Sequence, residues 1–309
     1  MRYRRRGLIA LVAVALLVTA CKAGSKADSS GDGGGGTGGS GGGGGGTQST
    51  APAASSVVTH HLSGADDNPH TLLHSGSAGT APIPSGSASD GKLTAQSFDG
   101  IPKAGALFLG VGGVASAHYC TASVVHSPSG DLIATAGHCV RNKLFGGWLD
   151  HILFVPGYHD EVAPYGVWVA TTAYVDSRWA DSEDQDADIA FLKVRKAGGG
   201  SQTLESLTGA STFTAGPGYT NAVSIVAYPL TAKRPVGCAT STSKFSATQL
   251  RLDCAGLPEG ASGSPFLASG DRLVGVLGGY QQGGDSSQTS YSIYFDDRIA
   301  AVFQAATGS

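Results

Sequence analysis

Charged residues are scarce in this chain of 309 residues: they make up 14% of it, against roughly 25% of an average globular protein. Neither sign dominates, because 20 Lys and Arg face 23 Asp and Glu and leave a net charge of −3. A nucleic-acid-binding domain normally presents a strongly basic face, so we expect no nucleic-acid partner. The composition also excludes a fibre, a wholly disordered chain and a multi-span membrane protein.

Long hydrophobic runs are missing as well, since none approaches the ~20 residues of a membrane-spanning helix. A basic start is followed by the shorter apolar stretch Gly7–Val18, which is the layout of an export signal. The stretch ends in VTAC, which resembles the bacterial lipobox, in which the cysteine is acylated and becomes the first residue of the mature protein. We predict a signal peptide over residues 1–20 and lipidation of Cys21. An ordinary signal peptide with a chance cysteine is the alternative.

Cysteine is also rare, with five residues. An odd number in an exported protein leaves one thiol to be explained. Lipidation of Cys21 removes it and leaves four, enough for two disulfides in an oxidising compartment. The sequence thus predicts a protein exported to the outer face of the cell membrane and anchored there by its lipid. Arg5-Arg6 leaves the twin-arginine export route open.

Residues 21–96 contain little that folds. The almost pure glycine tract Gly31–Gly46 cannot bury enough apolar area to offset its chain entropy. We predict a disordered Gly/Ser-rich tether over residues 21–96, with a typical reach of ~40–50 Å. The histidines of this segment are His60, His61, His70 and His74. Their spacing fits no metal-ligand motif, so we expect solvated loop residues and no metal site.

From Phe98 onward, short apolar runs alternate with Gly, Pro, Asn and Asp, and their β-branched and aromatic residues predict strands. The candidate strands are Ala106–Val111, Thr121–Val125, Leu132–Thr135, His151–Val155, Val167–Val175, Ile189–Val194, Ala222–Tyr228, Leu250–Asp253, Pro265–Ala268, Arg272–Leu277 and Tyr291–Phe295. One helix is predicted at the end of the chain, capped by Asp296 or Asp297. Its apolar face holds Ile299, Val302, Phe303 and Ala306. This pattern indicates an all-β barrel or sandwich.

Three strings in this portion carry residues with catalytic chemistry. They are TAGHC at 135–139, DADIAFL at 186–192 and GASGSPF at 260–266. A serine hydroxyl becomes a useful nucleophile only when an imidazole takes its proton, and the imidazole needs a carboxylate to orient it. Backbone N–H groups must also face the developing oxyanion, and glycine lets the chain turn to present them.

In this order on an all-β chain, the three strings resemble the trypsin/chymotrypsin-like serine proteases. FVPGY at 154–158 and PYG at 164–166 further resemble the secreted bacterial members. The resemblance predicts a protease domain over residues 97–309, built of two six-stranded antiparallel β-barrels and a C-terminal helix. It implies a monomeric serine endopeptidase that acts on protein or peptide substrates without a metal or an organic cofactor.

The resemblance also assigns roles. His138 matches the general base, Asp188 the acid that orients it, and Ser262 the nucleophile. The N–H groups of Gly260 and Ser262 match the oxyanion hole. Asp188 is the last acid before the apolar strand, and Asp186 is the reserve candidate for its role.

The remaining cysteines are assigned in the same way. Cys120 and Cys139 match the disulfide that staples the loop of the catalytic histidine, and we infer a second disulfide between Cys238 and Cys254. The residue before the serine is Ala261, where members activated from a zymogen carry Asp, and the domain has no I-V-G-G-like start. Activation by a new N-terminus paired with that Asp is therefore not expected.

The specificity prediction rests on three positions. Counting back from the serine places Gly256 at the base of the primary pocket, where it offers no charge to a Lys or Arg side chain. GVLGGY at 275–280 resembles the strand along which family substrates lie, so Gly278 and Tyr280 join Gly256 in the predicted pocket. We expect small or apolar residues before the scissile bond.

Other enzyme classes fail on the sequence. The nucleophile elbow of α/β-hydrolases reads G-x-S-x-G, but Ser264 stands at its last position and all nine histidines precede Ser262. The H-E-x-x-H motif of metalloproteases is absent. The remaining alternative is a protease-like domain that no longer cleaves and acts as a surface binding module. Because the chain keeps all three candidate residues, we favour an active peptidase.

Overall fold

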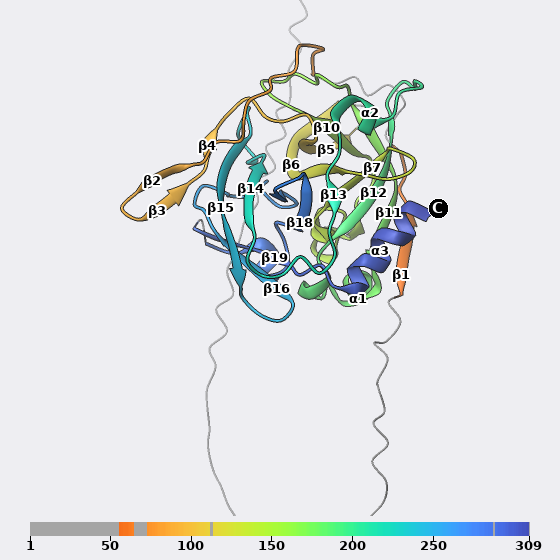
Figure 1. Cartoon of the computed structure of the whole chain (residues 1–309). Coiled ribbons are helices and arrows are strands. Elements are labelled where there is room, and N and C mark those ends of the chain that lie inside the picture. The colour runs from red at the N-terminus through yellow and green to blue at the C-terminus, as the bar shows by residue number, and fades with distance from the viewer. Residues whose placement is uncertain (1–55, 65–72, 112–113, 287, 309) are drawn as a thin grey trace, which may run out of the picture. The chain divides into compact units, whose positions relative to one another are not determined.

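The computed structural model describes residues 56–64, 73–111, 114–286 and 288–308. The predicted signal peptide, Cys21 and the glycine tract lie outside these residues. The described chain consists mainly of strands, with few and short helices (Figure 1). The all-β class predicted from the sequence is confirmed.

Six antiparallel strands close into a first barrel. They follow the order β11-β10-β5-β6-β7-β12, and the barrel closes because β12 also pairs with β11. The strands are β5 (Ala104–Val111), β6 (Val114–Val125), β7 (Leu132–Thr135), β10 (Ile152–Pro156), β11 (Trp168–Asp176) and β12 (Ala190–Lys196). Every residue of β7 and β10 is buried, so removal of apolar surface from water favours this closed arrangement.

A second sheet curls into half a barrel in the order β13-β18-β17-β14-β15-β16-β19. The strands are β13 (Thr212–Phe213), β14 (Ala222–Ala227), β15 (Val236–Lys244), β16 (Gln249–Asp253), β17 (Pro265–Ala268), β18 (Arg272–Val276) and β19 (Thr289–Ile293). Near the open side, the amide of Val276 donates to Ser292 Oγ at 2.9 Å, and the amide of Gly278 donates to the Tyr291 carbonyl at 3.0 Å. These two bonds hold β19 against the end of β18, where the path of paired strands does not close.

Short strands upstream of the predicted domain extend the sheets. They are β1 (Val57–His61), β2 (Ser87–Ser89), β3 (Lys92–Thr94) and β4 (Gln96–Ser97). β1 pairs with β11, β2 with β3, and β4 with β15. Strands therefore occur before the boundary expected at residue 97, within the segment expected to be a tether. Few apolar residues mark these strands in the sequence, because pairing with an existing sheet edge supplies their hydrogen bonds.

The last helix is the longest among the described residues. α1 (Ser177–Ser182) follows β11, α2 (Leu204–Thr208) follows β12, and α3 (Asp297–Gly308) packs on β11 and β12 (Figure 1). Of the two predicted caps of α3, Asp296 is used, since its Oδ1 accepts from the amides of Arg298 and Ile299 at 3.0 Å. Ile299, Val302 and Ala306 are buried, as their shared face predicts.

Shorter elements complete the fold. They are the 3-10 turns η1 (Gly137–Cys139), η2 (Lys143–Phe145), η3 (Gln185–Ala187) and η4 (Tyr280–Gly283), and the paired strands β8 (Arg141–Asn142) and β9 (Gly147–Trp148). Among the residues that the structure describes, no helix is both long enough and apolar enough to cross a membrane.

Candidate active site

His138 and Asp188 form a buried pair at the ends of two neighbouring barrel strands. His138 lies in η1, just after β7, and Asp188 follows η3, just before β12. Asp188 Oδ2 lies 2.8 Å from His138 Nδ1, and its Oδ1 accepts from the His138 amide at 2.8 Å. The two side chains are only 9% and 0% exposed. The carboxylate thus fixes the imidazole through Nδ1 and leaves Nε2 for another partner.

The same carboxylate is also held from the second sheet. The amide of Gly279 donates to Asp188 Oδ2 at 2.8 Å. A Cβ at the neighbouring Gly278 would lie 3.0 Å from that oxygen, so a side chain there would press against the carboxylate. Asp186, the reserve candidate, instead accepts from Gln249 Nε2 at 2.7 Å. The structure therefore brings Asp188, and not Asp186, to the imidazole.

The loop that carries Ser262 packs against the strands leading to His138. The Ser262 carbonyl accepts from the Thr121 amide at 2.8 Å. A Cβ at Gly263, whose φ is +82°, would overlap Thr121 O and Thr135 Oγ1 and lie 3.1 Å from the Ala136 amide nitrogen. Glycine at 263 thus lets the serine loop close onto the end of β7, next to the turn that contains the histidine.

Two backbone amides of this loop have no acceptor in the part of the chain that the structure describes. The amides of Ala261, Gly263 and Ser264 all donate to backbone carbonyls, whereas those of Gly260 and Ser262 donate to no acceptor among the residues that the structure describes. Gly260 has a φ of +92°, and a Cβ there would overlap the backbone of Leu230 and Tyr228. Two N–H groups on either side of one residue can bind an anionic oxygen, as the sequence predicted for the oxyanion hole.

Both disulfides predicted from the sequence are present. They join Cys120 to Cys139 and Cys238 to Cys254. Cys139 of the first disulfide directly follows His138 in the chain. The possible ligand atoms of Cys120, His138 and Cys139 lie within 4.8 Å of one another, as in a potential metal site. Because the two sulfurs are bonded to each other, neither offers the thiolate that a metal requires.

The predicted pocket residue Gly256 lies beside residues 93–95, which the sequence predicted to be part of the tether. The Ala255 amide donates to the Leu93 carbonyl at 2.7 Å, and the Ala95 amide donates to the Ala255 carbonyl at 2.8 Å. A Cβ at Gly256 would lie 3.4 Å from Thr94 Cγ2. The upstream segment therefore braces the chain at Ala255 and Gly256, seven and six residues before the serine. Leu93 was its single apolar signal in a polar stretch.

Tyr280, the third predicted pocket residue, begins η4 and follows Gly279, whose amide donates to Asp188. The residue is 36% exposed, and its ring packs with those of Phe245 and Tyr291, with centroids 4.9 and 5.0 Å away. Its amide donates to Gln249 Oε1 at 3.2 Å. Sequence reasoning did not identify Gln249, because a single glutamine in a strand gives no local signal.

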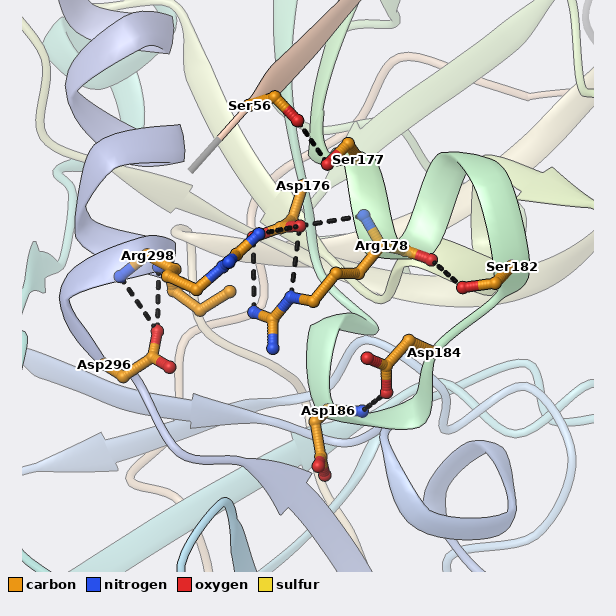
Figure 2. A network of polar contacts seen from close by, with 10 residues as sticks. Ser56, Asp176, Ser177, Arg178, Ser182, Asp184, Asp186, Asp296 and Arg298 are labelled. Atoms are coloured by element: carbon orange, nitrogen blue, oxygen red, sulfur yellow. Dashed lines mark hydrogen bonds and ion pairs between the residues drawn. The ribbon is translucent and has the colours of Figure 1, made fainter. Parts of the chain in front are cut away.

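A buried ion-pair network anchors the segment that runs from β11 to Asp188. Asp176 is fully buried and contacts Arg178 of α1 and Arg298 of α3, each at 3.2 Å (Figure 2). Burial raises the pKa of the Asp176 carboxyl, but the hydrogen bonds from Arg178 and Arg298 outweigh burial and hold that pKa below its usual value. The carboxylate stays ionised and ties α1 to the last helix. Its partner in α3 lies 122 residues away, so sequence alone could not pair them.

Comparison with known proteins places this architecture in a family. A family model described as the trypsin-like peptidase domain matches residues 120–276, about half of the chain. The match includes His138, Asp188 and Ser262. One curated relative, the extracellular metalloprotease of Bacillus subtilis (strain 168), is 31% identical over 84 residues. Those residues are 27% of this chain and 26% of the relative, so the chain spans about a quarter of that protein.

Solved structures share the fold. Protease Anisep from Arthrobacter nicotinovorans is 24% identical, with a TM-score of 0.60, covering 70% of this chain and 100% of that one. The thermostable serine protease AL20 from an extremophilic microorganism is 22% identical, with a TM-score of 0.58, covering 67% and 98%. A Glu endopeptidase in complex with MPD is 19% identical, with a TM-score of 0.54, covering 67% and 91%. At these identities the likeness shows the fold.

Proposed function

The chain belongs to the trypsin-like peptidase family, and on that premise we propose that it is a serine endopeptidase with Ser262 as nucleophile, His138 as general base and Asp188 as the orienting acid. One observation carries the proposal. A buried carboxylate holds Nδ1 of an imidazole at 2.8 Å, and the serine loop packs against the strand that leads to this imidazole. In the serine-protease mechanism the carboxylate orients the imidazole and the imidazole activates the serine hydroxyl, so these three groups must lie together.

In the proposed reaction, His138 Nε2 takes the proton of the Ser262 hydroxyl while Oγ attacks the carbonyl carbon of the scissile peptide bond. The oxyanion of the tetrahedral intermediate accepts hydrogen bonds from the amides of Gly260 and Ser262. His138 then gives its proton to the leaving amine, the C–N bond breaks, and an acyl-enzyme remains. A water molecule reverses the sequence and releases the acid. Asp188 stabilises the imidazolium and stays ionised throughout.

The proposed substrates are proteins or peptides with a small or apolar residue before the scissile bond. Gly256 and Gly278 bring no charged side chain to the predicted pocket, and Tyr280 narrows its rim with an aromatic ring. A Lys or Arg side chain would find no carboxylate at these three positions. Cleavage of a peptide library, read by mass spectrometry, tests this preference directly.

Export and anchoring at the outer face of the cell membrane are part of the proposal. Two disulfides in the folded part are typical of an oxidising compartment, and the curated relative is described as extracellular. The anchor would be a lipid on Cys21. Metabolic labelling with a radioactive fatty acid tests it: the label should appear on the processed chain that begins at Cys21 and be lost in Cys21→Ser.

Reaction of the full chain with a fluorophosphonate, followed by mass spectrometry of the labelled peptide, tests the catalytic assignment. The label is expected on Ser262 and should be lost in Ser262→Ala and His138→Ala. Ser264→Ala is the matched control, because it removes a hydroxyl from the same loop and should retain the label. A folded chain that takes no label would contradict the proposal and favour the inactive binding module.

A further inference from the structure

We propose that Gln249 is a positioning residue that holds the Asp188 loop and the turn beside the substrate in one fixed arrangement. The inference rests on the proposed function, because it assigns Asp188 its catalytic role. Gln249 is the first residue of β16, and its side chain lies between η3 and η4. It is 3% exposed, so each of its polar atoms needs a partner inside the protein.

The side-chain amide of Gln249 has three hydrogen-bond partners, and their chemistry identifies which of its ends is Nε2 and which is Oε1. Nε2 donates to the Gln185 carbonyl at 2.9 Å and to the Asp186 carboxylate at 2.7 Å. Oε1 accepts from the Tyr280 amide at 3.2 Å. The first two partners only accept and the third only donates, so the reversed amide would lose all three bonds. The side chain therefore has a single orientation.

The two loops that Gln249 joins also meet at Asp188. On one side, Gln185 and Asp186 immediately precede Asp188 in the chain. On the other, the Gly279 amide donates to Asp188 Oδ2 at 2.8 Å. A Cβ at Gly279 would overlap Gln249 Oε1, so the Gly279 backbone rests directly on the glutamine. A shift of the Gln249 side chain would move both the carboxylate and one of its donors.

Structural support of β16 does not need this side chain. The backbone of Gln249 pairs with Ile293 of β19, and its carbonyl accepts from the amides of Phe245 and Ser246. These bonds persist when only the side chain changes. The polar contacts of the side chain all point to the segments around Asp188 and Tyr280, which gives it two separable tasks. Nε2 holds the carboxylate loop, and Oε1 holds the turn.

Because the two tasks depend on different atoms of Gln249, two substitutions by side chains of nearly the same size as glutamine can test them separately. Gln249→Glu keeps an acceptor for the Tyr280 amide but places a carboxylate oxygen against Asp186 and the Gln185 carbonyl. Gln249→Met removes both the donor and the acceptor. Asp186→Asn in the Gln249→Glu background restores an amide donor with the polarity reversed. Gln282→Glu is the matched control, because it adds the same charge to η4 at an exposed side chain.

Two substrates separate the two tasks: p-nitrophenyl acetate, too small to lie along the turn, and labelled casein, which must lie along it. Rates are divided by the folded fraction from near-UV circular dichroism. In Gln249→Glu both rates should fall by the same factor, about 100-fold, as expected for a misplaced catalytic group. In Gln249→Met the casein rate should fall about ten-fold further than the ester rate. Adding Asp186→Asn to Gln249→Glu should raise the ester rate about ten-fold above that of Gln249→Glu alone.

Each outcome decides something different. Rates per folded molecule that match Gln282→Glu in both Gln249 variants would overturn the positioning role. Equal losses on ester and casein in Gln249→Met would overturn its task at the turn. A wild-type chain that reacts with neither ester nor fluorophosphonate would overturn the proposed function itself, whatever the variants do.

Discussion

The Gly279 amide donates to Asp188 Oδ2, the same oxygen that lies against His138 Nδ1, and both distances are 2.8 Å. Gly279 follows a strand of the second sheet, whereas His138 and Asp188 belong to the first barrel. The contact therefore joins the two halves of the fold at one carboxylate. A fully buried carboxylate with three donors is satisfied and rigid, so the second sheet helps to fix the imidazole in the first.

Gly279→Ala tests this connection. The substitution brings a Cβ onto Gln249 Oε1 at a φ of +79° and a ψ of −125°, a backbone conformation that is essentially restricted to glycine, so we expect the turn to shift and its amide to leave Asp188. We expect kcat for p-nitrophenyl acetate to fall by about 100-fold. Gly270→Ala is the control, because its φ is +72° but nothing lies within 4 Å of its Cβ. Equal losses in both variants would attribute the effect to backbone strain alone and contradict the connection.

Leu93→Asp tests the brace on the serine loop. Leu93 packs against the buried cluster that includes Cys254, Leu257 and Ala261, and its carbonyl accepts from Ala255. A charge at this half-buried site should cost about 1–3 kcal/mol of the free energy of unfolding. We expect Tm to fall by about 2–10 °C and the rate of Ser262 labelling to fall with it.

Lys92→Asp is the matched control for this brace, because residue 92 is exposed and lies in the same strand. It should leave Tm and the labelling rate near their wild-type values. A Leu93→Asp chain that unfolds earlier but labels at the wild-type rate below its Tm would separate the brace from the serine loop.

The triad candidates could be predicted from the sequence because each lies in a short string with its own local signal. Asp188 was separated from Asp186 by its position next to a buried strand, and the structure supports that choice through the bond to His138. Strands that contain runs of β-branched residues could also be predicted, because such a run is itself a local signal. Gln249 was missed, since its partners are 31 to 64 residues away. Only the folded chain brings them together.

Because of His118, we expect the free energy of unfolding to depend on pH near neutrality. Burial lowers the pKa of His118, and the hydrogen bond with the Ala232 carbonyl only partly opposes this. A lowered folded pKa means that the unfolded chain binds the proton more readily. The contribution to stability is therefore present above the unfolded pKa of about 6.5 and is lost as pH falls through and below that value.

The measurement is urea unfolding at about pH 7.5 and about pH 5.5, which lie about one unit on either side of that value. His118→Phe should show a smaller fall in the free energy of unfolding over this range than the wild type. His74→Phe, at an exposed position, should keep the wild-type fall. An unchanged fall in His118→Phe would assign the pH dependence to other groups.

Asp176 makes the corresponding prediction on the acid side, because the arginine bonds hold its pKa below the ordinary value of about 3.9. The stabilisation is present above that value and is lost as pH falls through the lower folded pKa. Asp176→Asn leaves Arg178 and Arg298 without their shared carboxylate (Figure 2). We expect a loss of about 3 kcal/mol at pH 7 and a weaker fall in stability below about pH 4 than in the wild type.

Asp271→Asn removes the partner of Lys103 at a side chain that is 71% exposed, where an ion pair contributes less than about 1 kcal/mol. Equal losses in the two variants, measured by urea unfolding, would show that the buried network adds nothing beyond a surface pair.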